Sequence, residues 1–495
     1  MVLYALLVTF LILFGYYYRT EKLNYWKKRN VVQINKNTWH FIFGKYSLSE
    51  FYKNMYDLFE AENFVGTFVG LKPVLIIKNP EDIKTVLQSD FQTFHSRGFK
   101  TNPKDDLAQN LLLIDNYTKW RLIRQKISPT FTSKKLKNMY NILERSSSDF
   151  VKYIEKNPHM KENPYKALHK FTSASISASV FGINPNTKNL IDSPLVDIIW
   201  NVADSFASFN FKLALANIFP KLHNFLNLKV FGAQKDVVVD AIKNILKYRR
   251  NTKERCHDFI DACIEMENEG VIKDNVTQYK LKVTPEFLGA QAYSLFFAGV
   301  DTVANSMHFT LLELSNNSEI LKKVHDEIDN VFDNCEGSIS LKDIMNLKYL
   351  DMVISESLRK YPPIGLMQRI CANETFLSSN VKVDKGCVVI VPIYGIHRDP
   401  RHFPNPDKFD PERFSPQNRM NISKFCYIPF GEGNRMCLGA RFAMIQMKSG
   451  LAWLLKHYTL RGYNYMPNCF EPSLFVIRDP KARYDLIVRN ETVIS

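Results

Sequence analysis

Residues 430–439, FGEGNRMCLG, constrain this chain more than any other segment. Gly431 and Gly433 allow a tight loop whose backbone N–H groups can point at the sulfur of Cys437. A cysteine binds a metal as a thiolate, and the thiolate needs such stabilisation. A helix is expected over about 439–457, so its positive end faces the same sulfur. The segment therefore predicts a metal-ligating cysteine at the start of a helix.

Taken alone, Cys437 is also compatible with a buried, inert thiol. The chain has eight cysteines with no CxxC pair and no regular spacing, which argues against a disulfide framework and against a zinc site. Most of them are expected to be reduced and buried. Arg435, two residues before Cys437, can reach a nearby anionic group. The complete ten-residue pattern decides between the two interpretations.

That pattern resembles the haem-binding loop of the cytochrome P-450 family at each defining position: Phe430, Gly431, Gly433, Arg435, Cys437 and Gly439. The resemblance implies that Cys437 is the axial ligand of the iron of heme b. It also implies that Phe430 packs over the thiolate and that Arg435 binds a haem propionate. The fold it implies is mainly α with small β-sheets, a triangular helical domain that sandwiches the haem.

The pattern along the chain independently favours an α+β fold. Residues 65–78 are typical of two short strands around a Lys-Pro turn, and residues 80–330 are mostly helical. A long apolar helix is expected over 285–315, opened by the Thr284-Pro285 pair, and another helix over 341–360. Short β-like pieces such as 388–394 then alternate with proline-rich turns. Helices in the first part of the chain and short strands in its last third indicate an α+β domain with mixed packing.

Three regions are expected: an anchor helix at 1–19, a linker and N-terminal region at 20–64, and a single catalytic domain at 65–495. Residues 2–18 carry no charge, and basic residues follow them, which places the body of the protein on the cytoplasmic side. A cleaved signal peptide is the competing interpretation, but its basic start and small-residue cleavage site are lacking. Residues 204–232 suit core or membrane surface equally.

Trp120 and Arg124 are four residues apart and share a helix face, and Arg369 follows ten residues after Arg359. Spacing alone is also compatible with a core tryptophan and exposed arginines. The resemblance implies that Trp120, Arg124 and Arg369 bind haem propionates. A guanidinium suits a carboxylate because its N–H groups form a planar fork.

The central apolar helix contains Ala298-Gly299-Val300-Asp301-Thr302. Thr302 can bond back to a carbonyl one turn earlier, which needs no further function. The segment also resembles the family's oxygen-binding motif. The resemblance implies that Ala298 lies against the haem, and that Asp301 and Thr302 are the acid and alcohol that relay protons. Val303 departs from the second threonine or serine of similar enzymes.

Glu356 and Arg359 lie three apart on one helix face, which by itself suits a weak surface ion pair. The resemblance makes them, with Arg413, a buried charge network that holds the cysteine loop. These three residues are structural in this interpretation and do not contact substrate.

No nucleotide-binding or flavin-binding motif is present, so reducing electrons must come from another protein. The resemblance implies NADPH, used indirectly through NADPH-cytochrome P-450 reductase, with cytochrome b5 as a further donor. The net charge of +15 suits an anionic membrane or an acidic partner, and no nucleic-acid signature accompanies it. Docking candidates are Lys119, Arg121, Arg124, Lys126, Lys424 and Arg441.

The predicted function is a monooxygenase that oxidises an apolar small molecule at the endoplasmic reticulum membrane, with a monomeric catalytic unit. FHSRG at 94–98 and SPTFTSKKLK at 128–137 resemble the microsomal, xenobiotic-metabolising branch, especially its insect members. Expected pocket residues are Phe296, Phe297, Leu366, Met367 and Phe475. A reductase-independent peroxide isomerase or dehydratase and a non-catalytic binder of apolar ligands are the alternatives. The linker after the anchor lacks that branch's usual prolines.

Overall fold

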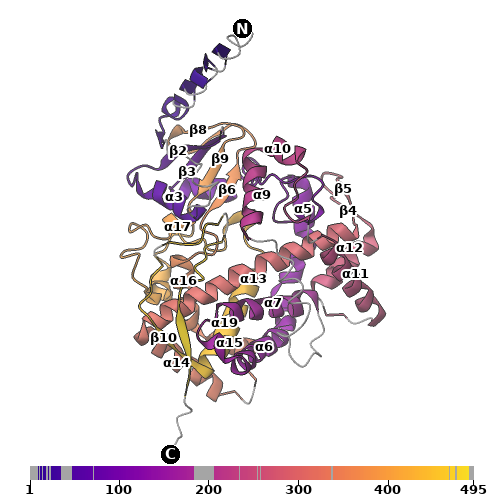
Figure 1. Ribbon diagram of the computed structural model, residues 1–495, viewed down its shortest axis with the longest axis vertical. Coiled ribbons are helices and arrows are strands. Elements are labelled where there is room, and N and C mark those ends of the chain that lie inside the picture. Colours follow the sequence, from indigo (N-terminus) through magenta and orange to yellow (C-terminus); the bar gives the residue numbers. More distant parts are fainter. Residues whose placement is uncertain are drawn as a thin grey trace, which may run out of the picture.

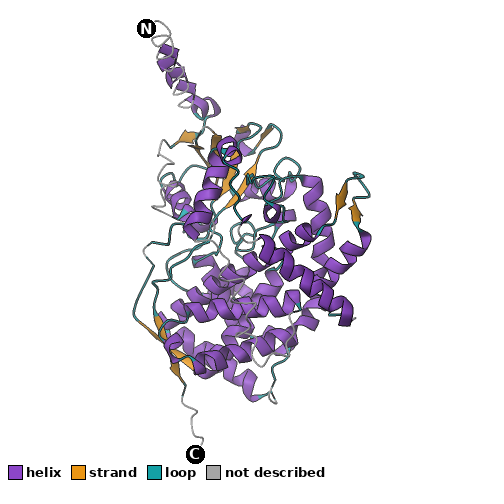
Figure 2. Cartoon of the chain, turned by 45° about the vertical axis from the view of Figure 1, so that its right-hand side comes forward, coloured by secondary structure: helices purple, strands orange, loops and turns teal. Residues whose placement is uncertain are grey.

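The computed structural model describes residues 9–10, 12–13, 15–17, 20–21, 24–34, 47–70, 72–182, 206–232, 235–252, 255–256, 258–335, 338–467, 469–473 and 476–489. Its architecture is mainly helical with small sheets, which confirms the expected fold class. Helices fill one side of the molecule, and most strands gather at the end that carries the N-terminus (Figures 1 and 2).

The longer helices are α3 (Leu48–Asp57), α5 (Tyr117–Ile127), α6 (Ser133–Lys156), α7 (Tyr165–Phe181), α9 (Phe206–Ile218), α10 (Pro220–Phe225), α11 (Lys235–Thr252), α12 (Phe259–Glu269), α13 (Pro285–Asn316), α14 (Ser318–Asp333), α15 (Leu341–Asn346), α16 (Lys348–Lys360) and α19 (Ala440–His457). Short helical turns are η1 (Lys27–Arg29), α4 (Pro80–Lys84), η2 (Thr85–Ser89), η3 (Asp106–Ala108), η4 (Ser128–Phe131), η5 (Pro158–Lys161), η7 (Ser378–Asn380), α17 (Ile393–Ile396), η8 (Pro411–Phe414), α18 (Pro416–Arg419) and η9 (Gly433–Arg435).

Helix α13 is the central element and crosses the molecule diagonally in Figure 1. The Thr284 side chain accepts a hydrogen bond from the Phe287 N–H, and Pro285 occupies the first turn, as the sequence predicts. The helix packs against α7, α11, α16 and α19. Its buried apolar side chains join those of α6, α7, α16 and α19 in the largest core cluster. Most of α13 is therefore a core helix.

The described residues also form four small sheets. The largest has the strand order β1 (Val32–Gln33), β2 (Phe64–Val69), β3 (Lys72–Ile77), β9 (Val388–Val391) and β6 (Met367–Ile370). The two-stranded sheets are β10 (Tyr458–Gly462) with β11 (Tyr484–Val488), β4 (Val271–Lys273) with β5 (Lys280–Lys282), and β7 (Thr375–Phe376) with β8 (Lys382–Val383). In the largest sheet, alternate residues of β3 enter different apolar clusters, because side chains along a strand alternate between its faces.

Three boundaries differ from the sequence-based expectations. The β2–β3 connection turns at Gly70, whose φ is +60°, and Pro73 lies inside β3, opposite Phe68. The expected helix over 341–360 is two helices, because Leu347 is fully buried in a non-helical conformation. The Glu327 carboxylate of α14 accepts the Tyr349 and Leu350 N–H groups at 2.8 and 2.9 Å and so caps α16. Strand β9 ends before Pro392, and a helical turn follows.

The segment after the expected anchor is fixed to the sheet by Trp26, which is fully buried. Its indole N–H donates to the Thr67 carbonyl at 3.0 Å, and its ring lies where a side chain on Gly66 would have to be. Tyr25 and Arg29 both donate to Asp384. These contacts hold the chain without the missing prolines. The expected anchor over 1–19 lies partly outside the described residues, and no described helix is long and apolar enough to cross a membrane.

Candidate functional site

Cys437 lies in a tight loop immediately before α19. Gly431 and Gly433 have φ values of +72° and +75°, which favour glycine. At Gly433 a β-carbon would come within 1.9 Å of the Leu87 carbonyl oxygen, so no larger residue fits there without displacing backbone. The Cys437 N–H donates to the Phe430 carbonyl at 2.8 Å and closes the loop. The backbone thus fixes the position of the sulfur.

The Cys437 side chain is exposed, but enough protein atoms surround its sulfur to desolvate the thiol. Desolvation raises the pKa of the thiol, against the opposing effects of a hydrogen bond from the Gly439 N–H and the charges of Arg124 and Arg97. Without a further positive charge the thiol therefore stays protonated at neutral pH. A bound metal ion deprotonates a coordinating thiol outright. The environment of Cys437 fits a thiolate that is completed by a cation.

Four arginines from separate segments gather near this loop: Arg97, Arg124, Arg369 and Arg435. Burial, together with repulsion between the arginines, lowers the pKa of Arg435 to about 8 and that of Arg369 to about 9. A guanidinium keeps its proton in proteins, so burying these positive charges close together lowers the stability of the fold. An anion among them would remove that cost.

Specific N–H groups of this cluster are unsatisfied. Nε and Nη1 of Arg435 and Nε of Arg369 are buried and have no hydrogen-bond partner among the described residues. The Arg435 guanidinium lies 4.5 Å from the ring centre of Trp120, and its Nη2 donates to the Ile114 carbonyl at 3.0 Å. Arg124 donates to the Met436 carbonyl at 3.0 Å, beside Cys437. Unpaired donors and a nearby thiol fit a ligand that has both carboxylates and a metal, such as haem.

The motif on α13 lies midway along the helix. Ala298 is exposed, although Phe296 and Val300 on either side are buried. The Thr302 hydroxyl donates to the Ala298 carbonyl at 2.7 Å, so the back-bonding conformation expected for a helical threonine is present. The helix is continuous through this point.

Asp301 is engaged in an ion-pair network. Its carboxylate faces Nε2 of His169 on α7 at 3.2 Å and the guanidinium of Arg478, whose Nε donates at 3.1 Å. The Asn305 side chain donates to it at 3.0 Å. Burial raises the pKa of Asp301, but His169 and Arg478 outweigh this effect and the net shift is downward. Asp301 is therefore an ionised carboxylate between two basic side chains.

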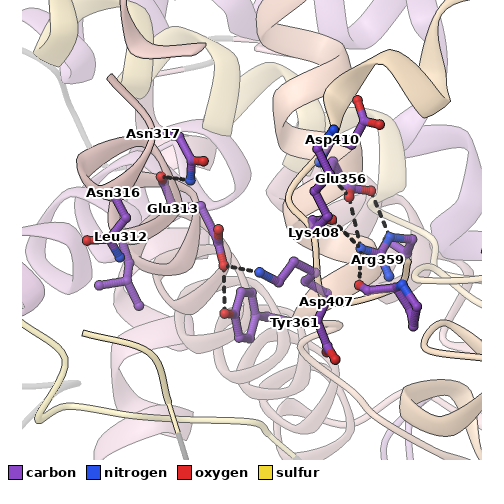
Figure 3. Close-up of polar contacts among 12 residues, drawn as sticks. Leu312, Glu313, Asn316, Asn317, Glu356, Arg359, Tyr361, Asp407, Lys408 and Asp410 are labelled. Atoms are coloured by element: carbon purple, nitrogen blue, oxygen red, sulfur yellow. Dashed lines mark hydrogen bonds and ion pairs between the residues drawn. The ribbon is translucent and has the colours of Figure 1, made fainter. Parts of the chain in front are cut away.

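Glu356 and Arg359 form a buried ion pair (Figure 3), and the partly buried Arg413 joins it. Nε and Nη2 of Arg359 donate to the Glu356 carboxylate at 2.7 and 2.9 Å, and both side chains are fully buried. Arg413 lies 3.4 Å from the same carboxylate. Arg359 also donates to the His397 carbonyl at 2.8 Å.

His397 connects this network to the cysteine loop. Its Nε2 accepts the Ile428 N–H at 3.0 Å, two residues before Phe430. Burial lowers the pKa of His397 to about 3, so the ring is neutral and Nε2 remains an acceptor. The chain of contacts from Arg359 through His397 to Ile428 places the start of the loop.

The expected pocket residues do not form one cluster. Phe296 packs against Phe181 in the main core, whereas Phe297 packs against Phe231 and Tyr293. Leu366 belongs to the core beside the largest sheet, and the sulfur of Met367 lies near Gly431. Phe475 lies outside the described residues.

Three side chains at the site were not predicted from the sequence: Arg97, His169 and Arg478. Arg97 lies within the FHSRG segment, whose resemblance indicated a subfamily but no role for this arginine. Its Nη2 donates to the Arg435 carbonyl at 3.2 Å. His169 and Arg478 are 132 and 177 residues from Asp301, and no local signal indicates their approach.

Comparisons with known proteins identify the family of this chain. The family model described as Cytochrome P450 matches residues 35–486. The chain is 30% identical over 480 residues to Cytochrome P450 6j1 of Blattella germanica, with 94% of this chain and 92% of the relative covered. It is 31% identical to Cytochrome P450 6B1 of Papilio polyxenes, with 91% and 92% covered, and 32% identical to Cytochrome P450 6A1 of Musca domestica, with 89% of both covered. These findings confirm the resemblance to insect members, and the chain belongs to the cytochrome P450 family, whose members are haem-dependent monooxygenases.

Proposed function

We propose that the protein is a membrane-bound monooxygenase that inserts one oxygen atom of dioxygen into an apolar small molecule. Electrons come from NADPH through a separate reductase. The observation that carries this proposal is the position of Cys437 beside the buried Arg435 and Arg369, whose Nε groups have no hydrogen-bond acceptor among the described residues. Bound heme b would supply the oxidising chemistry at iron, which a thiolate ligand promotes by electron donation.

Each side of the site has its own task. Cys437 would ligate the iron as a thiolate, and the Gly439 N–H would stabilise the negative sulfur. Arg435, Arg369, Arg124 and Trp120 hold the propionates, since the unsatisfied donors of Arg435 and Arg369 need carboxylate acceptors. Phe430 would pack over the sulfur, and the positive φ of Gly431 lets the loop turn so that the Phe430 carbonyl accepts the Cys437 N–H.

On α13, the exposed Ala298 would leave room for dioxygen because its side chain is a single methyl group. The Thr302 hydroxyl holds a proton at Oγ1 against the Ala298 carbonyl, and the preceding residue, Asp301, is the acid of the proposed proton relay. Glu356, Arg359 and Arg413 position the loop and contact no substrate.

The substrate class is apolar, because the expected pocket residues Phe296, Phe297, Leu366, Met367 and Phe475 carry no charge. A mostly apolar hollow between α3, the largest sheet and α9 supports an entry route; Phe51, Val69, Phe99, Leu213 and Ile218 are among its lining residues. Xenobiotics, plant toxins, insecticides and endogenous lipids or hormones all have this chemistry.

We place the enzyme at the endoplasmic reticulum membrane with its domain in the cytoplasm, anchored by residues 1–19. Exposed apolar side chains on α9 and α10 and at the ends of α10 support contact with lipid, and these two helices lie toward the end of the molecule that carries the N-terminus (Figure 1). They are Phe211, Phe219, Leu222, Phe225 and Leu226. This arrangement favours the surface interpretation of residues 204–232.

NADPH-cytochrome P-450 reductase is the proposed partner, with cytochrome b5 as a further donor and a monomeric catalytic unit. The basic docking candidates already have intramolecular contacts, which weakens their attraction for an acidic partner. Arg121 pairs with Asp274 at 2.6 Å, and Lys424 pairs with Glu432 at 3.1 Å. Lys119, Arg124, Lys126 and Arg441 also donate hydrogen bonds within the chain.

Reconstitution tests the proposal. The haem-loaded protein is incubated with reductase, NADPH and a panel of apolar compounds, and products are identified by mass spectrometry. Oxygenated product that requires both reductase and NADPH is expected. Cys437→Ser abolishes it, whereas Cys256→Ser, a change at an exposed thiol elsewhere, leaves it intact. Products formed from an organic peroxide alone, with none from reductase and NADPH, would overturn the proposal.

A further inference from the structure

We infer that His169 on α7 stores the transferable proton that Asp301 uses. Helix α7 packs along α13, and the His169 side chain is almost fully buried in their interface. Its Nδ1 lies 2.9 Å from the Tyr165 carbonyl, and its Nε2 lies 3.2 Å from Oδ1 of Asp301. The inference rests on the proposed function only for the use to which the proton is put.

Hydrogen-bond roles fix the hydrogens on the ring. The Tyr165 carbonyl can only accept, so Nδ1 must carry a hydrogen. Nε2 faces a carboxylate oxygen, and two acceptors at this distance need one hydrogen between them. That hydrogen belongs to Nε2, because Asp301 already receives donors from Arg478 and Asn305 and is held ionised by them. His169 is therefore doubly protonated.

Other titratable groups around His169 do not compete for this role. The Tyr165 hydroxyl donates to the Asn305 side chain at 3.1 Å, and burial raises its pKa above the ordinary range. His308, also in this cluster, contacts the Tyr484 hydroxyl at 3.1 Å. Burial lowers the pKa of His308 to about 3, so its ring is neutral. Arg478 keeps its proton, and Glu471 acts on Tyr165 through its charge.

The proposed step is the transfer of one proton from His169 to Asp301. The Nε2–H bond of His169 breaks and an O–H bond forms at Oδ1 of Asp301. The imidazolium becomes a neutral imidazole, the carboxylate becomes a carboxylic acid, and no electrons are exchanged. Asp301, which precedes Thr302 on α13, then carries the proton, and His169 regains one from the solvent. Without His169, Asp301 would remain an anion held by Arg478 and would have no proton to deliver.

Two substitutions separate proton storage from positioning. His169→Gln retains an N–H that can donate to Asp301 but has no proton to release, whereas His169→Leu removes both functions. In the full-length holoenzyme, the fraction of NADPH electrons that reach product is expected to fall about a hundredfold in both variants, within the range for lost acid–base catalysis. His308→Gln is the matched control, in which this fraction stays within about twofold of wild type. Unaltered coupling in His169→Gln would overturn the inference.

A spectroscopic measurement of the His169 ring nitrogens tests the inference without catalytic turnover. Nitrogen-15 NMR of histidine-labelled holoenzyme in its diamagnetic, carbon monoxide-bound ferrous state identifies His169 by the resonances that disappear in His169→Gln. Hydrogens on both ring nitrogens at pH 7 are expected, and a bare Nε2 would overturn the inference. If the protein takes up no haem, the proposed function fails, but the same spectrum of the haem-free chain still reports the hydrogens of His169.

Discussion

The buried pair of Glu356 and Arg359 gives the sharpest quantitative prediction. In Glu356→Leu, Arg359 keeps its charge in a fully buried position, and its remaining hydrogen-bond acceptors among the described residues are the backbone carbonyls of His397, Pro406 and Lys408 at 2.8, 2.7 and 3.4 Å. Removing one member of a buried ion pair costs about 3–5 kcal/mol. The Asp410 N–H, 2.9 Å from Glu356, also loses its acceptor, at about 1 kcal/mol. The free energy of unfolding should therefore fall by about 4–6 kcal/mol.

A double-mutant cycle tests this reasoning. In Glu356→Leu with Arg359→Met, no charge of the pair remains buried, so the loss should be at least about 2 kcal/mol smaller than the sum of the two single losses. Lys243→Met is the control, because it removes an exposed ion pair at the same i,i+3 spacing and should cost less than about 0.5 kcal/mol. Equilibrium urea unfolding followed by circular dichroism measures each value. Additive losses, or a Glu356→Leu loss as small as that of Lys243→Met, would refute the argument.

Gly433→Ala should reduce haem content and lower the free energy of unfolding by more than about 2 kcal/mol, because the added β-carbon meets the Leu87 carbonyl. In the control Gly386→Ala, where φ is also positive at +87° but the space is free, the free energy of unfolding should fall by only about 1 kcal/mol. Equal losses in the two variants would contradict this prediction. Arg435→Met should stabilise the haem-free chain and weaken haem retention, measured by urea unfolding and haem transfer, and a destabilised haem-free chain would count against it. Burial lowers the pKa of His397 to about 3, so below pH 6.5 the unfolded chain binds more protons than the folded chain, and the free energy of unfolding falls as the pH drops. His397→Gln should reduce the slope of this free energy against pH by up to about 1.4 kcal/mol per pH unit between pH 6 and 5. An unchanged slope would disprove that His397 is buried as a neutral imidazole.

Local signals sufficed where the stabilising contacts are local. The Thr284-Pro285 pair and the apolar run after it located α13, and the spacing of Glu356 and Arg359 indicated their pairing. Glycines around Cys437 predicted the tight loop because positive φ values belong to glycine. In each case the residues that determine the structure are neighbours in the sequence.

Contacts between distant segments could not be predicted in this way. The break at Leu347 depends on Glu327 of another helix, which supplies the cap that the local sequence lacks. The partners of Asp301 come from α7 and from the C-terminal segment, so the carboxylate looked like an isolated acid in the sequence. Gly70, rather than the Lys-Pro pair, makes the β2–β3 turn because a proline fits within β3.

The difference spectrum of the reduced protein with carbon monoxide tests the assignment of Cys437 most directly. A thiolate opposite carbon monoxide shifts the Soret band strongly to longer wavelength than a neutral ligand does. The well-folded wild-type protein and Cys256→Ser should both show this shifted band, and Cys437→Ser should lose it. A band typical of a neutral ligand in folded wild-type protein, or a shifted band that survives Cys437→Ser, would contradict the account.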